Sequence, residues 1–372
     1  MKLRIERQKF LKSWQLASRV NNGFLRIAGN VLEATDMKSS TKCVADGVDV
    51  LEDGVAVVPV NMLGSLLKKS ESEELILDVN ASRGLLKGTG NSTRFTIQPA
   101  DSYPNFPSSD CAELICTVKG SELARVIAEG NVAAAAPTDF PRYLGTCLMK
   151  ADSGILTVIS TDGKRLSVSE TSNIAFDNTG EMILTSSATK ELGKTLAQNY
   201  ADNDVKILTD GVITWFQVEN VEFAIVRVEA NFPAYIRILN DEVYTRLKIN
   251  RSELISALER ISIISRSTTA NLVAMQLIPE QEKVKLFSRA PEVGMTSETL
   301  LGEITENPLQ CGFNVNFLLD GLRAITTDQV EMVFSGADTQ MRIKSDNFLY
   351  MVMPARLSNL DLMTDEETED LQ

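Results

Sequence analysis

The chain has 372 residues, of which 44% are hydrophobic and 23% are charged, and its net charge is −13. This length and composition are typical of a globular protein of two to three domains. The sequence contains no histidine, which excludes Ser-His-Asp and Cys-His nucleophile pairs and nearly all catalytic zinc sites.

The cysteines and the N-terminus indicate the compartment. The five cysteines are an odd number without a Cys-x-x-Cys motif: Cys43, Cys111, Cys116, Cys147 and Cys311. A chain long enough to bury its own cores does not need a disulfide framework, so we expect free thiols in a reducing environment. The first seven residues alternate charged and apolar side chains, and no apolar run approaches the roughly 18 residues of a membrane helix. We therefore expect a cytoplasmic protein, without a metal or other cofactor.

The first third of the chain contains two strand-helix pairs. A strand at residues 3–6 precedes a helix from Gln8 to Arg19, and a strand from Val55 to Pro59 precedes a helix from Asn61 to Lys69. A further strand at residues 94–97 is followed by the tripeptide Asn105-Phe106-Pro107.

The same order recurs in the other two thirds. The predicted helices there are Ser121 to Asn131, Thr189 to Asn199, Ser252 to Ser262 and Phe317 to Ile325, with Ser121, Ser252 and Asn316 as expected N-caps. Short alternating runs such as residues 283–287 predict antiparallel strands. The final strands of the thirds contain Phe95, Phe223 and Phe348, which are 128 and 125 residues apart, close to the 124 residues of one third. We therefore predict an α+β fold of three tandem copies, each with two helices on antiparallel sheets.

Basic residues recur on or beside the polar faces of these helices. They are Lys12, Arg19, Lys68, Lys69, Arg125, Lys190, Lys194, Arg260, Arg266 and Arg323. A cationic lining on an acidic chain favours contact with the phosphates of duplex DNA, and no zinc finger or recognition-helix pattern indicates base reading. The alternative, an ordinary solvated helix surface, stays open for each of them.

Catalytic motifs are missing from the sequence. There is no Gly-x-x-x-x-Gly-Lys-Ser/Thr phosphate loop, and no spacing of carboxylates indicates an acid-base pair. Asp162 and Asp210 each precede a glycine, which is first of all a turn signal.

Four segments carry a family resemblance. Thr161-Asp162-Gly163-Lys164-Arg165-Leu166, Phe232-Pro233-Ala234-Tyr235, Gly312-Phe313-Asn314-Val315 and Met353-Pro354-Ala355-Arg356-Leu357 resemble the bacterial DNA polymerase III beta subunit, the replicative sliding clamp, in order along the chain. The resemblance implies clamp domains at 1–113, 114–243 and 244–357, followed by an acidic tail at 358–372. It also implies a head-to-tail homodimer, a ring whose helices line a hole for duplex DNA. Such a protein is not an enzyme. Its implied partners are the DNA polymerase catalytic subunit, a clamp loader and other proteins with short clamp-binding motifs, with no membrane.

The resemblance also implies a pocket for partner peptides between the second and third domains. The matching positions are Leu144, Thr161, Gly163, Lys164, Arg165, Leu166, Pro233, Arg237, Ile238, Met351, Val352, Met353 and Pro354. An apolar surface rimmed by a few polar groups is typical of peptide sites, although such residues can equally form the core of a domain junction. The family often has His or another basic residue where this chain has Lys164.

A subunit interface and a DNA-contacting loop are implied in the same way. Phe95 and Ile97, near the end of the first domain, would meet Ile263 and Ile264, which are expected to follow a helix of the third. Exposed apolar residues at strand edges otherwise favour aggregation, so a partner is expected. Arg142 and Tyr143 match a loop that touches DNA in relatives.

Two segments depart from the family. The stretch from Asn21 to Asp36 is short, so the first domain could lack a strand, and the tail contains Asn359-Leu360-Asp361-Leu362-Met363, which resembles the Gln-Leu-x-Leu-Phe peptide of clamp partners. Two other readings stay open: a clamp-like paralogue that binds DNA and partners outside the main replicase, and a carboxylate-dependent enzyme built from repeated domains. Light scattering separates the last from the clamps, because only the clamps require a dimer.

Overall fold

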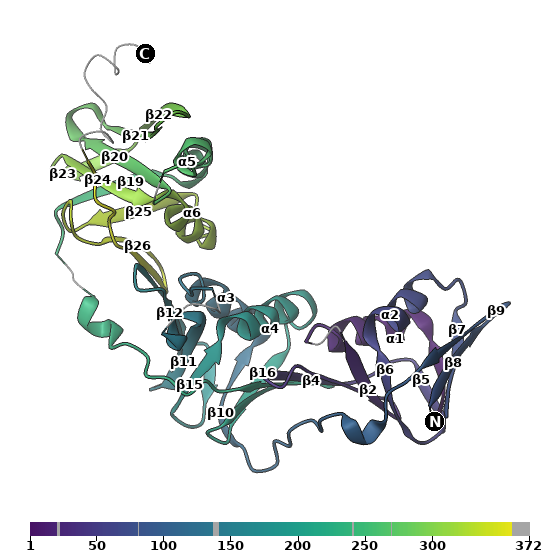
Figure 1. The fold of residues 1–372 in the computed structure, drawn as a ribbon. Coiled ribbons are helices and arrows are strands. Elements are labelled where there is room, and N and C mark those ends of the chain that lie inside the picture. Colours follow the sequence, from purple (N-terminus) through teal and green to yellow (C-terminus); the bar gives the residue numbers. More distant parts are fainter. Residues whose placement is uncertain (21–22, 81, 137–140, 240–241, 269, 359–372) are drawn as a thin grey trace. The chain divides into compact units, whose positions relative to one another are not determined.

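A computed structural model describes residues 1–20, 23–80, 82–136, 141–239, 242–268 and 270–358 (Figure 1). The chain divides into two compact units. Unit 1 comprises Met1–Arg125, Lys150–Leu156 and Ser172–Glu229, and unit 2 comprises Val126–Met149, Thr157–Thr171 and the chain from Ala230 onward. No helix within the described ranges combines the length and the apolar character that a membrane span requires.

The described elements occur three times in the same order: a strand and a helix, four strands, a second strand and helix, and three strands. The first copy is β1 (Lys2–Glu6), α1 (Arg7–Ala17), β2 (Phe24–Ala28), β3 (Val31–Thr35), β4 (Ser39–Val44), β5 (Val48–Glu52), β6 (Val55–Pro59), α2 (Val60–Lys69), β7 (Glu74–Asn80), β8 (Arg83–Gly88) and β9 (Asn91–Thr96), followed by η1 (Ala100–Ser102). The second copy is β10 (Glu113–Lys119), α3 (Gly120–Gly130), η2 (Arg142–Gly145), β11 (Thr146–Asp152), β12 (Ile155–Thr161), β13 (Arg165–Thr171), β14 (Ile174–Phe176), β15 (Gly180–Thr185), α4 (Ser186–Asn199), β16 (Asp204–Thr209), β17 (Ile213–Val218) and β18 (Val221–Val226), followed by η3 (Tyr235–Ile238). The third copy is β19 (Thr245–Asn250), α5 (Arg251–Ser265), β20 (Leu272–Ile278), η4 (Pro279–Gln281), β21 (Lys283–Ala290), β22 (Gly294–Leu301), β23 (Glu303–Glu306), β24 (Leu309–Asn314), α6 (Val315–Ala324), β25 (Gln329–Phe334), β26 (Met341–Ser345) and β27 (Phe348–Val352).

This order confirms the predicted α+β fold of three copies. The first copy has the full set β1 to β9, so the idea that it could lack a strand is wrong. The short connection before Thr35 removes loop residues and no strand. The domain limits at 113, 243 and 357 stay a prediction, because the two compact units divide the chain differently.

Antiparallel sheets run from one copy into the next. In unit 1 the sheets are β5-β1-β7-β8-β9 and β14-β10-β16-β17-β18-β4-β3-β2-β6. In unit 2 they include β22-β21-β20-β24 and the run β13-β27-β26-β25-β19-β23. The last strand of the second copy, β18, therefore pairs with β4 of the first, and β27 of the third copy pairs with β13 of the second.

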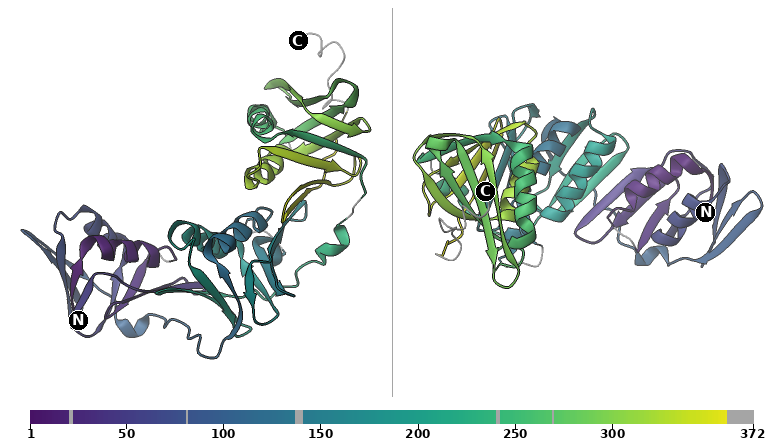
Figure 2. Two further views of the ribbon diagram at one scale, coloured as in Figure 1. Left: turned by 180° about the vertical axis from the view of Figure 1, so that it is seen from behind. Right: turned by 90° about the horizontal axis from the view of Figure 1, so that it is seen from above.

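The two helices of a copy pack against each other over its strands. Figure 2 shows α1 and α2 side by side, in purple and blue, and α5 packs against α6 in the same way. At the start of α1, the Arg7 side chain donates hydrogen bonds to the carbonyls of Ser72 and Leu67 beyond and within α2. Arg251 at the start of α5 makes the same two contacts with Thr327 and Leu322, which ties the helix pair of each of these copies together.

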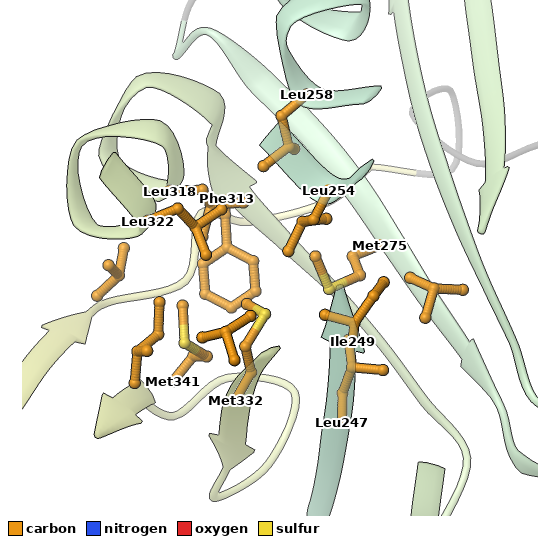
Figure 3. Close-up of a cluster of buried hydrophobic side chains, with 14 of the residues drawn as sticks. Leu247, Ile249, Leu254, Leu258, Met275, Phe313, Leu318, Leu322, Met332 and Met341 are labelled. Atoms are coloured by element: carbon orange, nitrogen blue, oxygen red, sulfur yellow. The ribbon is translucent and has the colours of Figure 1, made fainter. Parts of the chain in front are cut away.

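The core of the third copy lies between these helices and the strands. Leu254 and Leu258 of α5 and Leu318 and Leu322 of α6 surround the Phe313 ring, and Met275, Met332, Met341, Leu247 and Ile249 close the cluster from the strands (Figure 3). All are at most 1% exposed. Burial of this many large side chains, each worth roughly 1.5–3 kcal/mol, fixes the helices on the sheet.

Two local predictions are wrong. The N-caps of α5 and α6 are Asn250 and Asn314, whose side chains accept hydrogen bonds from the backbone N–H groups of Glu253 and Asn316, while Ser252, Asn316 and Ser121 lie inside helices. Each helix begins directly at the end of its strand, so an asparagine that looks like the last strand residue is the cap.

The phenylalanines used to align the copies are not equivalent. The hairpins pair Gly88 with Asn91, Val218 with Val221, and Ser345 with Phe348, so these first residues of β9, β18 and β27 correspond. Phe95, Phe223 and Phe348 are then the fifth, third and first residues of their strands. The strands recur as predicted, but the register differs.

Candidate functional site

A tight turn between β12 and β13 organises the candidate partner surface. The Thr161 hydroxyl donates to the Arg165 carbonyl at 2.7 Å and accepts from the Gly163 N–H at 3.1 Å. Asp162 Oδ1 accepts from the N–H groups of Lys164 and Arg165 at 2.9 and 3.0 Å. Gly163 has φ +82, a left-handed conformation that glycine adopts without strain.

Arg165 fastens this turn to the third copy. Its guanidinium donates to Asp162 Oδ2 at 2.8 Å, to Asp320 Oδ2 of α6 at 2.7 Å and to the Tyr350 hydroxyl of β27 at 3.3 Å. Its Cζ lies 4.4 Å from the centre of the Phe317 ring, and the side chain is 10% exposed. The guanidinium is thus paired, hydrogen-bonded and stacked, which offsets the loss of its hydration.

Tyr350 is a neutral donor in this cluster. Burial raises the pKa of its phenol above the ordinary value, and the nearby Arg165 opposes that rise without cancelling it. The protonated hydroxyl donates to the Phe317 carbonyl at 2.9 Å. It therefore accepts from Arg165 and donates to α6, linking β13, β27 and α6.

Strand pairing then brings the predicted residues together. Arg165 pairs with Val352 and Leu166 with Met351 across β13 and β27, and the Met353 N–H donates to the Lys164 carbonyl at 2.8 Å. Leu166, Met351 and Val352 are buried, whereas the Met353 side chain is 48% exposed. The turn and the end of β27 thus present an exposed thioether beside a closed apolar layer.

The other predicted positions lie in the same unit. Leu144 is half-buried in η2, and its carbonyl accepts from the Ala135 N–H. Arg237 and Ile238 lie in η3, where Ile238 is 53% exposed, and Pro233 and Pro354 are half-buried. The Tyr143 ring lies 6.3 Å from Phe232, edge to face.

The sequence did not reveal the groups that hold Arg165. Asp320, Tyr350 and Phe317 lie more than 150 residues away in the chain, and no local pattern marks them as partners. Asp162 was interpreted as a turn residue only, and the structure confirms this role while adding the ion pair. The same backbone turn recurs at Thr35–Ser39 and Thr209–Ile213, but Ser39 and Ile213 stand where Arg165 stands.

The predicted interface residues differ in exposure. Phe95 is buried in its own unit, where its ring covers Gly84, and Ile97 is half-buried. Ile263 and Ile264 lie in the last turn of α5, which corrects the expectation that they follow the helix. Ile263 is 68% exposed, an unusual state for a large aliphatic side chain.

The predicted DNA-facing cations fall into two groups. Arg19, Arg125, Arg260 and Arg323 form ion pairs with Glu191, Glu122, Glu298 and Glu259. Lys12, Lys68, Lys69, Lys190, Lys194 and Arg266 lie exposed on or at the ends of α1, α2, α4 and α5. Arg142 begins η2, and its side chain lies outside the described part of the structure.

Comparison with known proteins places these features in a family. Residues 236–356 match the family described as DNA polymerase III beta subunit, C-terminal domain. The beta sliding clamp of Staphylococcus aureus is 26% identical over 320 residues, which cover 84% of this chain and 82% of the relative. Among solved structures, the DNA polymerase III subunit beta of Pseudomonas aeruginosa is 25% identical with a TM-score of 0.87, covering 96% of this chain and all of that one. The Bacillus subtilis sliding clamp shares the fold, with a TM-score of 0.88 at 19% identity.

Proposed function

Because this chain belongs to the DNA polymerase III beta subunit family, the sliding clamps, we propose that it works as a homodimeric ring around duplex DNA. Its function is that of a DNA sliding clamp, a non-catalytic processivity factor. The observation that carries this proposal is that the likeness extends over nearly the whole chain and all three copies. A ring of this kind needs no base-specific contact and holds DNA by enclosing it. Its place of action is the cytoplasm, where bacterial DNA is replicated.

The partner-peptide surface is formed by the turn at Thr161 to Arg165 and the end of β27. Met353 and Ile238 supply exposed apolar area, and the Arg165 cluster fixes the turn beside them. Short linear motifs with two or more bulky apolar residues suit such a surface, because their few anchors bind without ordering a large interface. The polymerase catalytic subunit, the clamp loader and other motif-bearing proteins would share it.

The exposed lysines on the helices supply the contact with DNA. A sequence-independent attraction of this kind weakens steeply with salt, whereas enclosure does not. The cations paired with glutamates contribute less, because their charge is already neutralised locally. We therefore assign the main role to Lys12, Lys68, Lys69 and Lys194.

The dimer is formed by edge strands of the first and third copies, with Phe95, Ile97, Ile263 and Ile264 at the seam. The exposed side chain of Ile263 supports this assignment, because an apolar residue of this exposure on a helix end requires a cover. The test of the whole proposal is loading onto nicked circular DNA by a clamp loader, followed by linearisation. A ring stays on the circle and slides off the linear product.

A clamp-like paralogue that serves partners outside the main replicase remains the second candidate. Extension of a primed circle by the replicative polymerase distinguishes the two. The main clamp lengthens the products made in one binding event, and a paralogue that loads equally well leaves them short.

A further inference from the structure

The two places where copies join within the chain are built alike, residue by residue. Where β4 meets β18, the Val44 N–H donates to the Asn220 carbonyl and the Val226 N–H donates to the Lys38 carbonyl, at 2.9 and 2.8 Å. Where β13 meets β27, the Glu170 N–H donates to the Asn347 carbonyl and the Met353 N–H to the Lys164 carbonyl, at 3.0 and 2.8 Å. The spacings agree, with 126 residues from 44 to 170 and from 38 to 164, and 127 from 220 to 347 and from 226 to 353. The copies therefore meet by one rule.

One strand of each type is left over. By element order, β22 of the third copy corresponds to β4 and β13, and β9 of the first copy corresponds to β18 and β27. Among the described strands, β22 and β9 are the last in their sheets, and β9 ends its sheet beside β8 (Figure 1). The rule that fills the other two junctions thus predicts that β22 accepts the β9 of a second copy.

The rungs of the sheets fix the register of this third junction. In the first copy Val57 pairs with Arg26, Arg26 with Glu33, Glu33 with Lys42, and Lys42 with Glu222 of the next copy. In the third copy the matching rung is Gly312, Ala274, Phe287 and Ser297, because Val57 and Gly312 both lie two residues before the N-cap residues Pro59 and Asn314. Ser297 therefore takes the place of Lys42.

The partner of Ser297 follows from the hairpins. Glu222 is the second residue of β18, directly after Val221, which corresponds to Asn91 at the start of β9. Ser92 is accordingly the residue that takes the place of Glu222. The same step in the middle junction pairs Leu349, the second residue of β27, with Val168.

A helix contact gives an independent check. Glu129 lies ten residues after the end of β10 and accepts a hydrogen bond from Ser169, the residue after Val168. Arg260 lies ten residues after the end of β19 and binds Glu298, the residue after Ser297, with two hydrogen bonds at 2.6 and 2.8 Å. The helix thus contacts the same strand position in both copies, which agrees with the rung assignment.

The helix ends explain why this junction lies open. Arg19, Val132 and Ile263 each lie thirteen residues after the strand that precedes their helix. Arg19 donates to Glu191 and Thr195 of α4, and Val132 packs against the core cluster that contains Leu319 and Leu322 of α6. Both therefore contact the second helix of the next copy, whereas Ile263 is exposed. Its place in the pattern is against α2 of a second chain.

From these junctions we infer that β22 pairs antiparallel with β9 of a second copy of this chain, with Ser297 opposite Ser92 and Met295 opposite Arg94. This inference rests on the proposed dimeric ring and assigns the register of its seam. In the same register Thr296 faces Thr93, Glu298 faces Asn91, and Phe95 faces Gly294. The Phe95 ring, which already covers Gly84, then has a residue without a side chain opposite it in the partner.

Engineered disulfides test the register directly. The variant Ser92→Cys/Ser297→Cys places both thiols on one rung, where Cα atoms lie about 5.5 Å apart, within the range of disulfides. Two matched controls, Ser92→Cys/Thr299→Cys and Ser92→Cys/Met295→Cys, shift one thiol by two residues in either direction on the same face. Their separation of roughly 7–8 Å or more is beyond easy bridging. All three carry Cys111→Ser, which removes the exposed native thiol.

Each protein is first weighed by light scattering under reducing conditions and then oxidised mildly and run on a non-reducing gel. We expect a dimer in every case, and covalent dimer formation at least about tenfold faster for the Ser297 pair than for either control. A dimer that cross-links fastest through Thr299 or Met295 overturns the register and leaves the ring intact. A disulfide within a single chain overturns the second-copy pairing, and a monomer before oxidation overturns both the seam and the proposed ring.

Discussion

Replacement of Arg165 by alanine tests whether one guanidinium holds the partner surface to the third copy. Arg165 is 10% exposed and forms ion pairs with Asp162 at 2.8 Å and Asp320 at 2.7 Å. Removing one partner of a buried ion pair costs about 3–5 kcal/mol. Here Asp320 is 44% exposed, and Asp162 keeps its two backbone donors, so water and the turn compensate part of the loss. We expect the free energy of unfolding of unit 2 to fall by about 2–3 kcal/mol.

Urea unfolding separates this effect from a global one. Both tryptophans, Trp14 and Trp215, lie in unit 1, so tryptophan fluorescence follows unit 1 while far-UV circular dichroism follows both units. Arg165→Ala should lower the dichroism midpoint by roughly 1 M urea and move the fluorescence midpoint less. Lys164→Ala is the matched control, because its neighbouring side chain is exposed and should change stability by less than about 0.5 kcal/mol. Equal midpoints for the two variants would refute the reasoning.

Four further outcomes are expected. Ile263→Asp should convert the dimer of 40.9 kDa chains to a folded monomer, because an unpaired carboxylate buried at the seam costs several kcal/mol; light scattering that still finds a dimer at micromolar concentration would contradict this. Met353→Asp should weaken binding of a Gln-Leu-x-Leu-Phe peptide about tenfold or more, equivalent to about 1.4 kcal/mol, whereas Met37→Asp at the equivalent turn of unit 1 should leave the dissociation constant unchanged. The Ile213 and Val212 N–H groups lower the pKa of Asp210 below its ordinary 3.8; such a group stabilises above its unfolded pKa, so the stability difference between wild type and Asp210→Asn should shrink as pH falls through 3.8 and the folded value, and a constant difference would sink the assignment. Removal of the tail after Leu357, most of which lies outside the described residues, should tighten peptide binding if the tail competes, by about tenfold for 90% occupancy, and equal dissociation constants would show no competition.

Local patterns predicted most of the fold but not its register. Strand-helix pairs such as Leu247–Asn250 and the helix after it carry their signals in neighbouring residues, so the three copies could be found from alternation and helical spacing. Register depends on which residues face each other across hairpins, and the aligned phenylalanines were misleading because each strand buries an aromatic ring at a different position. The N-caps failed for a related reason: Asn250 and Asn314 end a strand and cap a helix at once.

The candidate site was predictable only in its parts that share a segment. Thr161, Asp162 and Gly163 form a turn from local hydrogen bonds, and their pattern indicates that turn. Asp320 and Tyr350 reach Arg165 through tertiary packing between copies, for which a single sequence carries no signal. The dimer-facing role of Ile263 became visible only through comparison with Arg19 and Val132, which occupy the same position in the other copies.

Retention on DNA of different topology tests the central claim most directly. The protein is loaded on nicked circular DNA and challenged at 200 mM salt, where a protein held by 6–10 phosphate contacts loses roughly 10³–10⁵ in affinity relative to 50 mM. The account predicts that it stays on the circle at this salt concentration and leaves within the dead time once a restriction enzyme linearises the DNA. Equal rates of loss from circular and linear DNA would contradict it.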